Sequence, residues 1–185
     1  MTSIKILISL LPIIFMVHDF EEIVMFEPWL RKNRSELKRR FPKFEKFLNK
    51  QHYFDYTTSA FAIAVLHEFI LISFITIMSL WYDQYHWWFG AFMAYFLHLF
   101  VHIGQWIIYK KYVPVIITSI LTLPYCFYTF KLFLTTTAMD FLQMLMWTII
   151  GIIITVVSFP SAFFFASKFD RWVKENYYKN EKTNP

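Results

Sequence analysis

The stretch IKILISLLPIIFMVHDFEEIVMF, residues 4–26, is long enough as a helix to cross a bilayer, which needs about 20 apolar residues. Besides Lys5 near its start, it contains four ionisable side chains, His18, Asp19, Glu21 and Glu22. A single charge near the bilayer centre costs about 2.5–3.5 kcal/mol even on the mildest insertion scales. A sequence that keeps four such groups together therefore indicates that at least some of them are used.

Helical spacing sorts these four side chains. His18 lies three residues before Glu21 and four before Glu22, so these three share one face of a helix. Asp19 lies about 100° round the helix from His18. We expect Asp19 to point to a neighbouring helix or the interface, outside a shared site.

The rest of the chain has the composition of a membrane protein. Of its 185 residues, 57% are hydrophobic and 17% are charged, against about 25% charged in a soluble domain. The first apolar stretch is too long for a signal-peptide core and lacks a small-residue cleavage site, so we expect it to be retained. The sequence predicts an all-α, polytopic membrane protein, one membrane-embedded domain over 1–185, with five transmembrane helices at about 4–26, 57–81, 87–109, 113–134 and 140–166.

Charge distribution predicts the orientation. The segment 29–51 is rich in Lys and Arg, whereas the turn 82–86 has neither. The positive-inside rule then places 29–51 and the tail 167–185 in the cytoplasm and the N-terminus outside the cell membrane. The bias toward Lys, Ile and Phe, with scarce Gly and Ala, favours a bacterial source. The net charge of +5 is explained by these positions, so we expect no nucleic-acid partner. Segment 29–51 is either an amphipathic element on the anionic lipids of the cytoplasmic leaflet or a solvated loop that fixes topology.

Other intramembrane ionisable side chains are His67 and Glu68 in the second predicted span and His98 and His102 in the third. A rise of about 1.5 Å per residue places them within one to two helical turns of the first motif in depth. His52 and His86 lie in loop or interfacial positions, and we expect them to be incidental. Three helices are thus predicted to bring together His18, Glu21, Glu22, Glu68, His98 and His102.

Imidazole and carboxylate groups at helical spacing are typical ligands of Zn, Fe or Mn. The six side chains are therefore candidate ligands of a divalent metal ion, with Glu22 and Glu68 as candidates for a carboxylate left free as a catalytic general base. The single cysteine, Cys126, excludes an internal disulfide and a cysteine-based zinc cluster. Metal-free acid–base chemistry on a lipophilic substrate and a proton or ion relay in a small transporter remain alternatives.

Several side chains also have simpler interpretations. His67 points about 100° away from Glu68, which favours packing over ligation. His102 lies one turn from the interface, where it could hydrogen-bond to a neighbouring helix. Glu21 or Glu22 alone could pair with one of the cations that follow them.

The order of motifs resembles a known family. The pattern His18-x-x-Glu21-Glu22 in the first helix is followed by an intramembrane histidine, His98 or His102, and by Tyr112-Val113-Pro114. These features resemble the HXXEE domain family of small prokaryotic membrane proteins, which is also marked by a Tyr-x-Pro-Gly motif. The resemblance covers most of the chain and brings no biochemistry with it.

One position departs from this pattern, because Val115 stands where the motif has glycine. If that glycine permits a tight turn, this chain must make the turn otherwise. Our leading hypothesis is a metal-dependent membrane enzyme that acts on a lipid or apolar substrate reached from the cytoplasmic half of the bilayer. The rival hypothesis is a non-enzymatic carrier, immunity or interaction protein whose polar cluster only holds helices together.

Overall fold

The computed structural model describes residues 3–51, 53–136 and 139–178, and in these residues it is all-helical. Five of the helices are long and apolar enough to cross a membrane, which confirms the predicted class and span number. The elements are α1 Ser3–Arg40, α2 Pro42–Lys50, α3 Thr58–Tyr82, α4 His86–Tyr109, α5 Ile116–Thr136 and α6 Phe141–Val173, followed by one π turn, Lys174–Tyr178.

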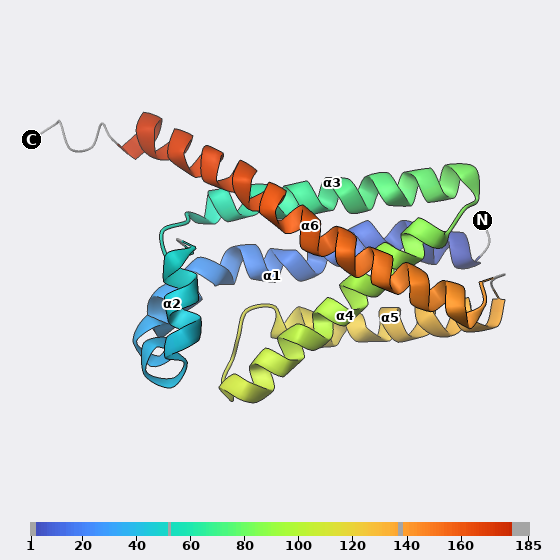
Figure 1. Ribbon diagram of the computed structural model, residues 1–185, viewed down its shortest axis with the longest axis horizontal. Coiled ribbons are helices and arrows are strands. Elements are labelled where there is room, and N and C mark those ends of the chain that lie inside the picture. The colour runs from blue at the N-terminus through green and yellow to red at the C-terminus, as the bar shows by residue number, and fades with distance from the viewer. Residues whose placement is uncertain (1–2, 52, 137–138, 179–185) are drawn as a thin grey trace, which may run out of the picture.

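The five long helices form a closed ring. α1 packs on α3, α3 on α6, α6 on α4, α4 on α5, and α5 returns to α1. Figure 1 shows α1 and α3 running side by side while α6 crosses them at an angle. The short α2 lies at the same end of the bundle as the connection between α4 and α5. We call this the α2 end, and the opposite one the N-terminal end.

The first helix is longer than the predicted span. It continues beyond Phe26 and passes Pro28 without a break. It ends at Arg40, and the next residue, Phe41, directly before Pro42, is not helical. A residue before proline is driven out of the helical region, which explains the break. The predicted basic segment 29–51 is therefore the end of α1 together with α2, joined at one corner.

The other boundaries shift by a few residues. α5 begins three residues later than predicted because residues 113–115 form a turn, and α6 continues past 166 to Val173. His52, residues 137–138 in the turn before α6, and the tail 179–185 lie outside the described residues.

Side chains define where two of the helices begin. The Thr57 hydroxyl accepts a hydrogen bond from the Ala60 amide at the start of α3. Asp140 and Gln143 form a reciprocal capping box at the start of α6. Both arrangements satisfy amides that have no partner within the helix.

Two glycines set the crossing of α4 and α6. A Cβ atom on Gly151 would overlap the backbone of Gly90, so the two helices approach as closely as their backbones allow. Small residues serve this purpose at helix crossings in membranes. The third glycine, Gly104, has open space around it.

A proline inside α1 is compensated from α4. Pro12 has no N–H, which leaves the Ile8 carbonyl without its helical donor. The indole Nε1–H of Trp88, a fully buried residue, donates to that carbonyl at 3.2 Å. Backbone groups in a membrane must be satisfied internally, and this bond also ties α1 to α4 near the N-terminal end.

Candidate metal centre

Three histidines from two helices meet between α1 and α4. One ring nitrogen each from His18, His98 and His102 lie within 4.8 Å of one another. The Nε2 atoms of His98 and His102 are 2.7 Å apart, as their i,i+4 spacing on α4 allows. The ring centre of His18 lies 5.8 Å from that of His98 and 5.4 Å from that of His102.

The His18 ring has an unused nitrogen. His18 is fully buried, and its Nε2 has no hydrogen-bond partner among the described residues. The nearest carboxylate oxygen is Asp19 Oδ1, at 3.9 Å. A buried polar atom without a partner is costly, so this nitrogen is suited to a ligand. Tyr95 packs edge-on against the same ring, with the ring centres 5.6 Å apart, and donates its own hydroxyl to Thr122.

A glutamine orients the third imidazole. His102 Nδ1 lies 3.1 Å from Gln105 Oε1, one turn along α4. Because an amide oxygen only accepts, this bond places the His102 proton on Nδ1 and leaves a lone pair on Nε2. Metal-binding histidines are commonly held in this way by a partner on the remote nitrogen.

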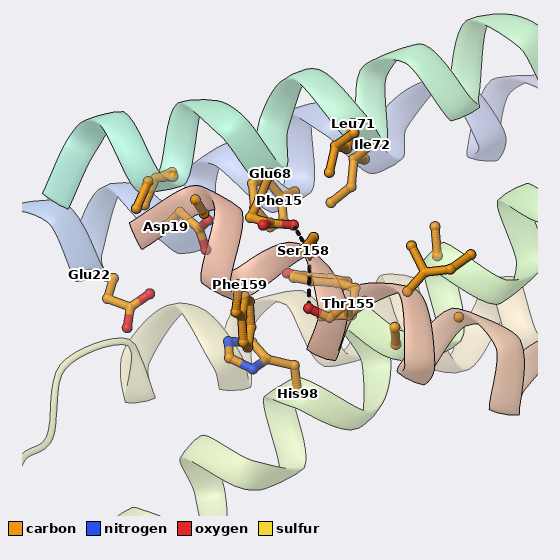
Figure 2. A pocket seen from close by; sticks show the side chains of 18 of the residues that line it. Phe15, Asp19, Glu22, Glu68, Leu71, Ile72, His98, Thr155, Ser158 and Phe159 are labelled. Atoms are coloured by element: carbon orange, nitrogen blue, oxygen red, sulfur yellow. Dashed lines mark hydrogen bonds between the residues drawn. The ribbon is translucent and has the colours of Figure 1, made fainter. Parts of the chain in front are cut away.

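The imidazoles of His98 and His102 line a cavity of about 380 Å³ enclosed by α1, α3, α4 and α6. Figure 2 shows Asp19 and Glu22 extending from α1 and Glu68 from α3, with His98 on the opposite side. The remaining lining is mostly aliphatic and aromatic. Such a chamber, apolar with a few convergent polar groups, is the usual form of a small-molecule site.

Glu68 is held in place by two helices. Its Oε2 accepts from the Ser158 hydroxyl of α6 at 2.9 Å, as Figure 2 shows, and His67 Nδ1 lies 3.2 Å from Oε1. The His67 ring also packs on Phe165, with the ring centres 5.8 Å apart. His67 thus supports Glu68 and takes no part in the histidine cluster.

The expectation that Asp19 lies apart from the site is wrong. Asp19 is only 4% exposed, lines the cavity, and lies within electrostatic range of Glu22 and Glu68. Asp19 and Glu22 are three residues apart and share a face of α1. The i,i+3 spacing of Asp19 and Glu22 is the sequence pattern that indicates this shared face.

Glu21 has a different place. It does not line the cavity, and both of its carboxylate oxygens are engaged. Oε1 accepts from the Tyr112 hydroxyl at 2.8 Å, and Oε2 accepts from the amide and hydroxyl of Thr118 at 2.8 and 2.7 Å. Glu21 therefore caps the N-terminus of α5 from another helix. Burial and this carboxylate raise the pKa of Tyr112 above its usual range.

A sequence model of the family described as a protein of unknown function with HXXEE motif matches residues 9–129. The chain belongs to the HXXEE family. No curated protein and no solved structure matches it. In this HXXEE protein the motif is divided among three places: His18 lies in the histidine cluster, Glu21 caps α5, and Glu22 faces the cavity.

The turn that receives Glu21 explains the glycine of the Tyr-x-Pro-Gly pattern. Val115 has φ of 69°, in the left-handed region that a β-branched residue rarely adopts. The HXXEE protein thus makes the same kind of turn that glycine would make, with valine in its place. The cost is about 1–2 kcal/mol of backbone strain. The Val115 side chain is 1% exposed, so its burial offsets that strain.

Proposed function

We propose that this HXXEE protein is a metal-dependent membrane enzyme that acts on a lipid or other apolar substrate. The observation that carries this proposal is a cluster of three imidazole nitrogens within 4.8 Å of one another, of which His98 and His102 line an apolar cavity and His18 lies behind them. A carrier or structural protein needs no unpartnered buried nitrogen such as His18 Nε2, whereas a ligand site does.

The ligands in this proposal are His18, His98 and His102. Three protein ligands with an open fourth position are typical of catalytic sites for Zn, and imidazole also suits Fe. Mn remains a candidate if a carboxylate joins the set. Glu21 is less suited to ligation because both of its oxygens already accept hydrogen bonds.

The carboxylates of the cavity supply the acid–base chemistry in this proposal. A divalent ion held by the imidazoles would supply Lewis acidity and a more acidic bound water. Glu22 shares the cavity wall with His102 and is our candidate for the general base. Glu68, held by Ser158 and His67, is the candidate for the proton donor to the leaving group.

The orientation is part of the proposal. We place the α2 end in the cytoplasm and the protein in the cell membrane, following the positive-inside rule. Phe44 and Phe47 of α2 are 46% and 51% exposed, among lysines of the same helix. An apolar and basic surface of this kind suits contact with the anionic lipids of the cytoplasmic leaflet.

Metal content tests this proposal. The protein is purified in detergent, supplied with Zn, Fe or Mn, desalted and measured by elemental analysis. We expect about one ion per chain for wild type and a loss of most of it in His18→Ala and His102→Ala. The matched control is His86→Ala, because His86 lies at the start of α4, away from the cluster.

Two results would overturn the proposal. One is wild-type metal content below about 0.2 ion per chain after metal addition, since a preorganised three-histidine site should fill. The other is equal metal content in wild type and His18→Ala while both remain folded. A folded, metal-free protein would turn attention to acid–base chemistry at Glu22 and Glu68.

A further inference from the structure

A second cavity extends the first toward the α2 end. It has a volume of about 310 Å³ and lies between the end of α1, α2 and the α4–α5 connection. Both cavities share lining residues, which are Glu22, Phe26, Leu48, His102 and Gln105. The carboxylate of Glu22 and the ring of His102 therefore lie where the two apolar chambers meet. A linear molecule with its polar group at that point would have an apolar chamber on each side.

The chambers contain no cation that could hold an anionic head group. Among the described residues that line either cavity there is no Lys or Arg, whereas Asp19, Glu22 and Glu68 all face the first. Buried phosphates are normally held by Arg or Lys through charge-assisted hydrogen bonds. A divalent ion held by the imidazoles would already have these three carboxyl groups near it.

Helix N-termini are the other usual site for a phosphate, and at the α2 end those of α3 and α5 are already occupied. Glu21 accepts the Thr118 amide at the start of α5. Glu27 accepts the amide and hydroxyl of Thr58 at the start of α3, at 2.8 and 2.6 Å. Two carboxylates of α1 thus accept the free backbone amides at the starts of α3 and α5.

Cations near the α2 end are held outside the chambers by ion pairs. Arg31 pairs with Glu27 at 2.7 Å and Lys111 with Glu36 at 2.8 Å. The guanidinium of Arg34 lies 3.5 Å from the carboxylate of Glu45 in α2. These cations suit the membrane surface and not the interior of the site.

We propose that the substrate is a linear lipid whose reacting group is uncharged, such as an ester, amide or alcohol, and that phosphate-bearing lipids are excluded. The inference rests on the proposed function for the reaction, but head-group selection is a property of the chambers alone. A charged phosphate transferred into them would lose its hydration without a matched partner.

Competitive binding tests the head-group selection. Delipidated protein in detergent, metal-loaded and metal-free, receives equimolar monoolein and 1-oleoyl-lysophosphatidic acid, which share one chain, and adducts are counted by native mass spectrometry. We expect the monoolein adduct to exceed the phosphate adduct at least about tenfold, which corresponds to 1.4 kcal/mol. Equal adducts, or an excess of the phosphate lipid, would overturn the inference.

Blocking variants show whether the adduct lies in the cavity. Thr155→Phe adds a ring at the cavity wall of α6, whereas Ile153→Phe adds the same ring on an exposed position of the same helix. We expect loss of the monoolein adduct in the first and retention in the second. Ala64→Leu, from the α3 wall, replaces Thr155→Phe if that variant does not fold. The inference is overturned if a blocking variant folds and still binds monoolein as well as the wild type.

Failure of this inference and failure of the proposed function give different results. Full metal content with no head-group selection overturns the inference and leaves the metal function standing. Head-group selection in a protein that binds no metal supports the inference and overturns the metal function.

Discussion

Glu21 of α1 caps the first turn of α5 at Thr118, whose amide and hydroxyl both donate to one carboxylate oxygen at 2.8 and 2.7 Å. The other oxygen accepts from Tyr112, so this one side chain ties α1 to both sides of the α4–α5 turn. His18 lies one turn earlier on α1, and the Thr118 hydroxyl is also 3.3 Å from its carbonyl. The HXXEE motif therefore joins a structural anchor to a candidate ligand on one helix.

Because Glu21 anchors the start of α5, we expect its replacement to lower the stability of the protein and to leave metal binding in place. Glu21→Ala leaves the part-buried Thr118 amide and the Tyr112 hydroxyl without their acceptor, and we expect it to lower the free energy of unfolding by about 2–4 kcal/mol. Glu21→Gln keeps an acceptor and should recover about half of this loss. Thermal unfolding in detergent measures both. If Glu21→Gln, while folded, lost its metal as His18→Ala does, Glu21 would be a ligand and not an anchor.

Val115 predicts a difference between two neighbouring valines. Val113 and Val115 are both buried in the α4–α5 connection, but only Val115 has a positive φ. Replacing either by glycine removes a buried side chain worth about 1.5–3 kcal/mol. Val115→Gly also relieves about 1–2 kcal/mol of backbone strain. We therefore expect Val113→Gly to lower the melting temperature clearly more than Val115→Gly; equal losses would contradict the strain.

The crossing of α4 and α6 gives a third prediction. Gly151→Ala places a Cβ atom against the Gly90 backbone, which must shift because no flexible side chain is present to yield. We expect a loss of about 1–3 kcal/mol, the usual cost of overpacking. Gly104→Ala is the matched control on α4, where the space is open and alanine gains up to about 1 kcal/mol in helix propensity. Opposite shifts in melting temperature are the expected result.

Much of this structure follows from the sequence because it depends on local patterns. Apolar length predicts the five spans, and i,i+4 spacing predicts that His98 and His102 lie together. Depth counted along the successive spans then places His18 at the same level as these two histidines. That α1 and α4 meet at that level does not follow from their order along the chain, because α3 lies between them in sequence.

The parts that the sequence does not predict depend on helix rotation. Whether Asp19 or Glu21 faces the interior is decided by about 100° of rotation of α1, which the neighbours of α1 determine. Depth alone cannot show that Glu21 meets the start of α5 and not the histidines. The left-handed conformation of Val115 could likewise not be predicted from the residue itself, because valine rarely adopts a positive φ.

A surface ion-pair network at the α2 end predicts a pH effect. Hydrogen bonds from Lys111 and Arg40 lower the pKa of the Glu36 carboxyl from its usual 4.5 to about 2. A lowered pKa means that the stabilisation is complete above pH 4.5 and is lost as the pH falls toward about 2. The difference in melting temperature between wild type and Glu36→Gln should therefore shrink over this range. A difference that stays constant from pH 7 to pH 2 would contradict this prediction.

Gln105 predicts a positioning effect on the candidate metal centre. Its side-chain oxygen, 3.1 Å from His102 Nδ1, holds the proton on that nitrogen and directs the Nε2 lone pair toward His18 and His98. Gln105→Leu removes this partner, and we expect metal affinity to fall about 10- to 100-fold while saturating metal still fills the site. Gln105→Glu keeps an acceptor on Nδ1 and should retain wild-type affinity or exceed it. Competition with a chelator measures the affinity, and a Leu variant that holds metal as tightly as the Glu variant would show that Gln105 only packs.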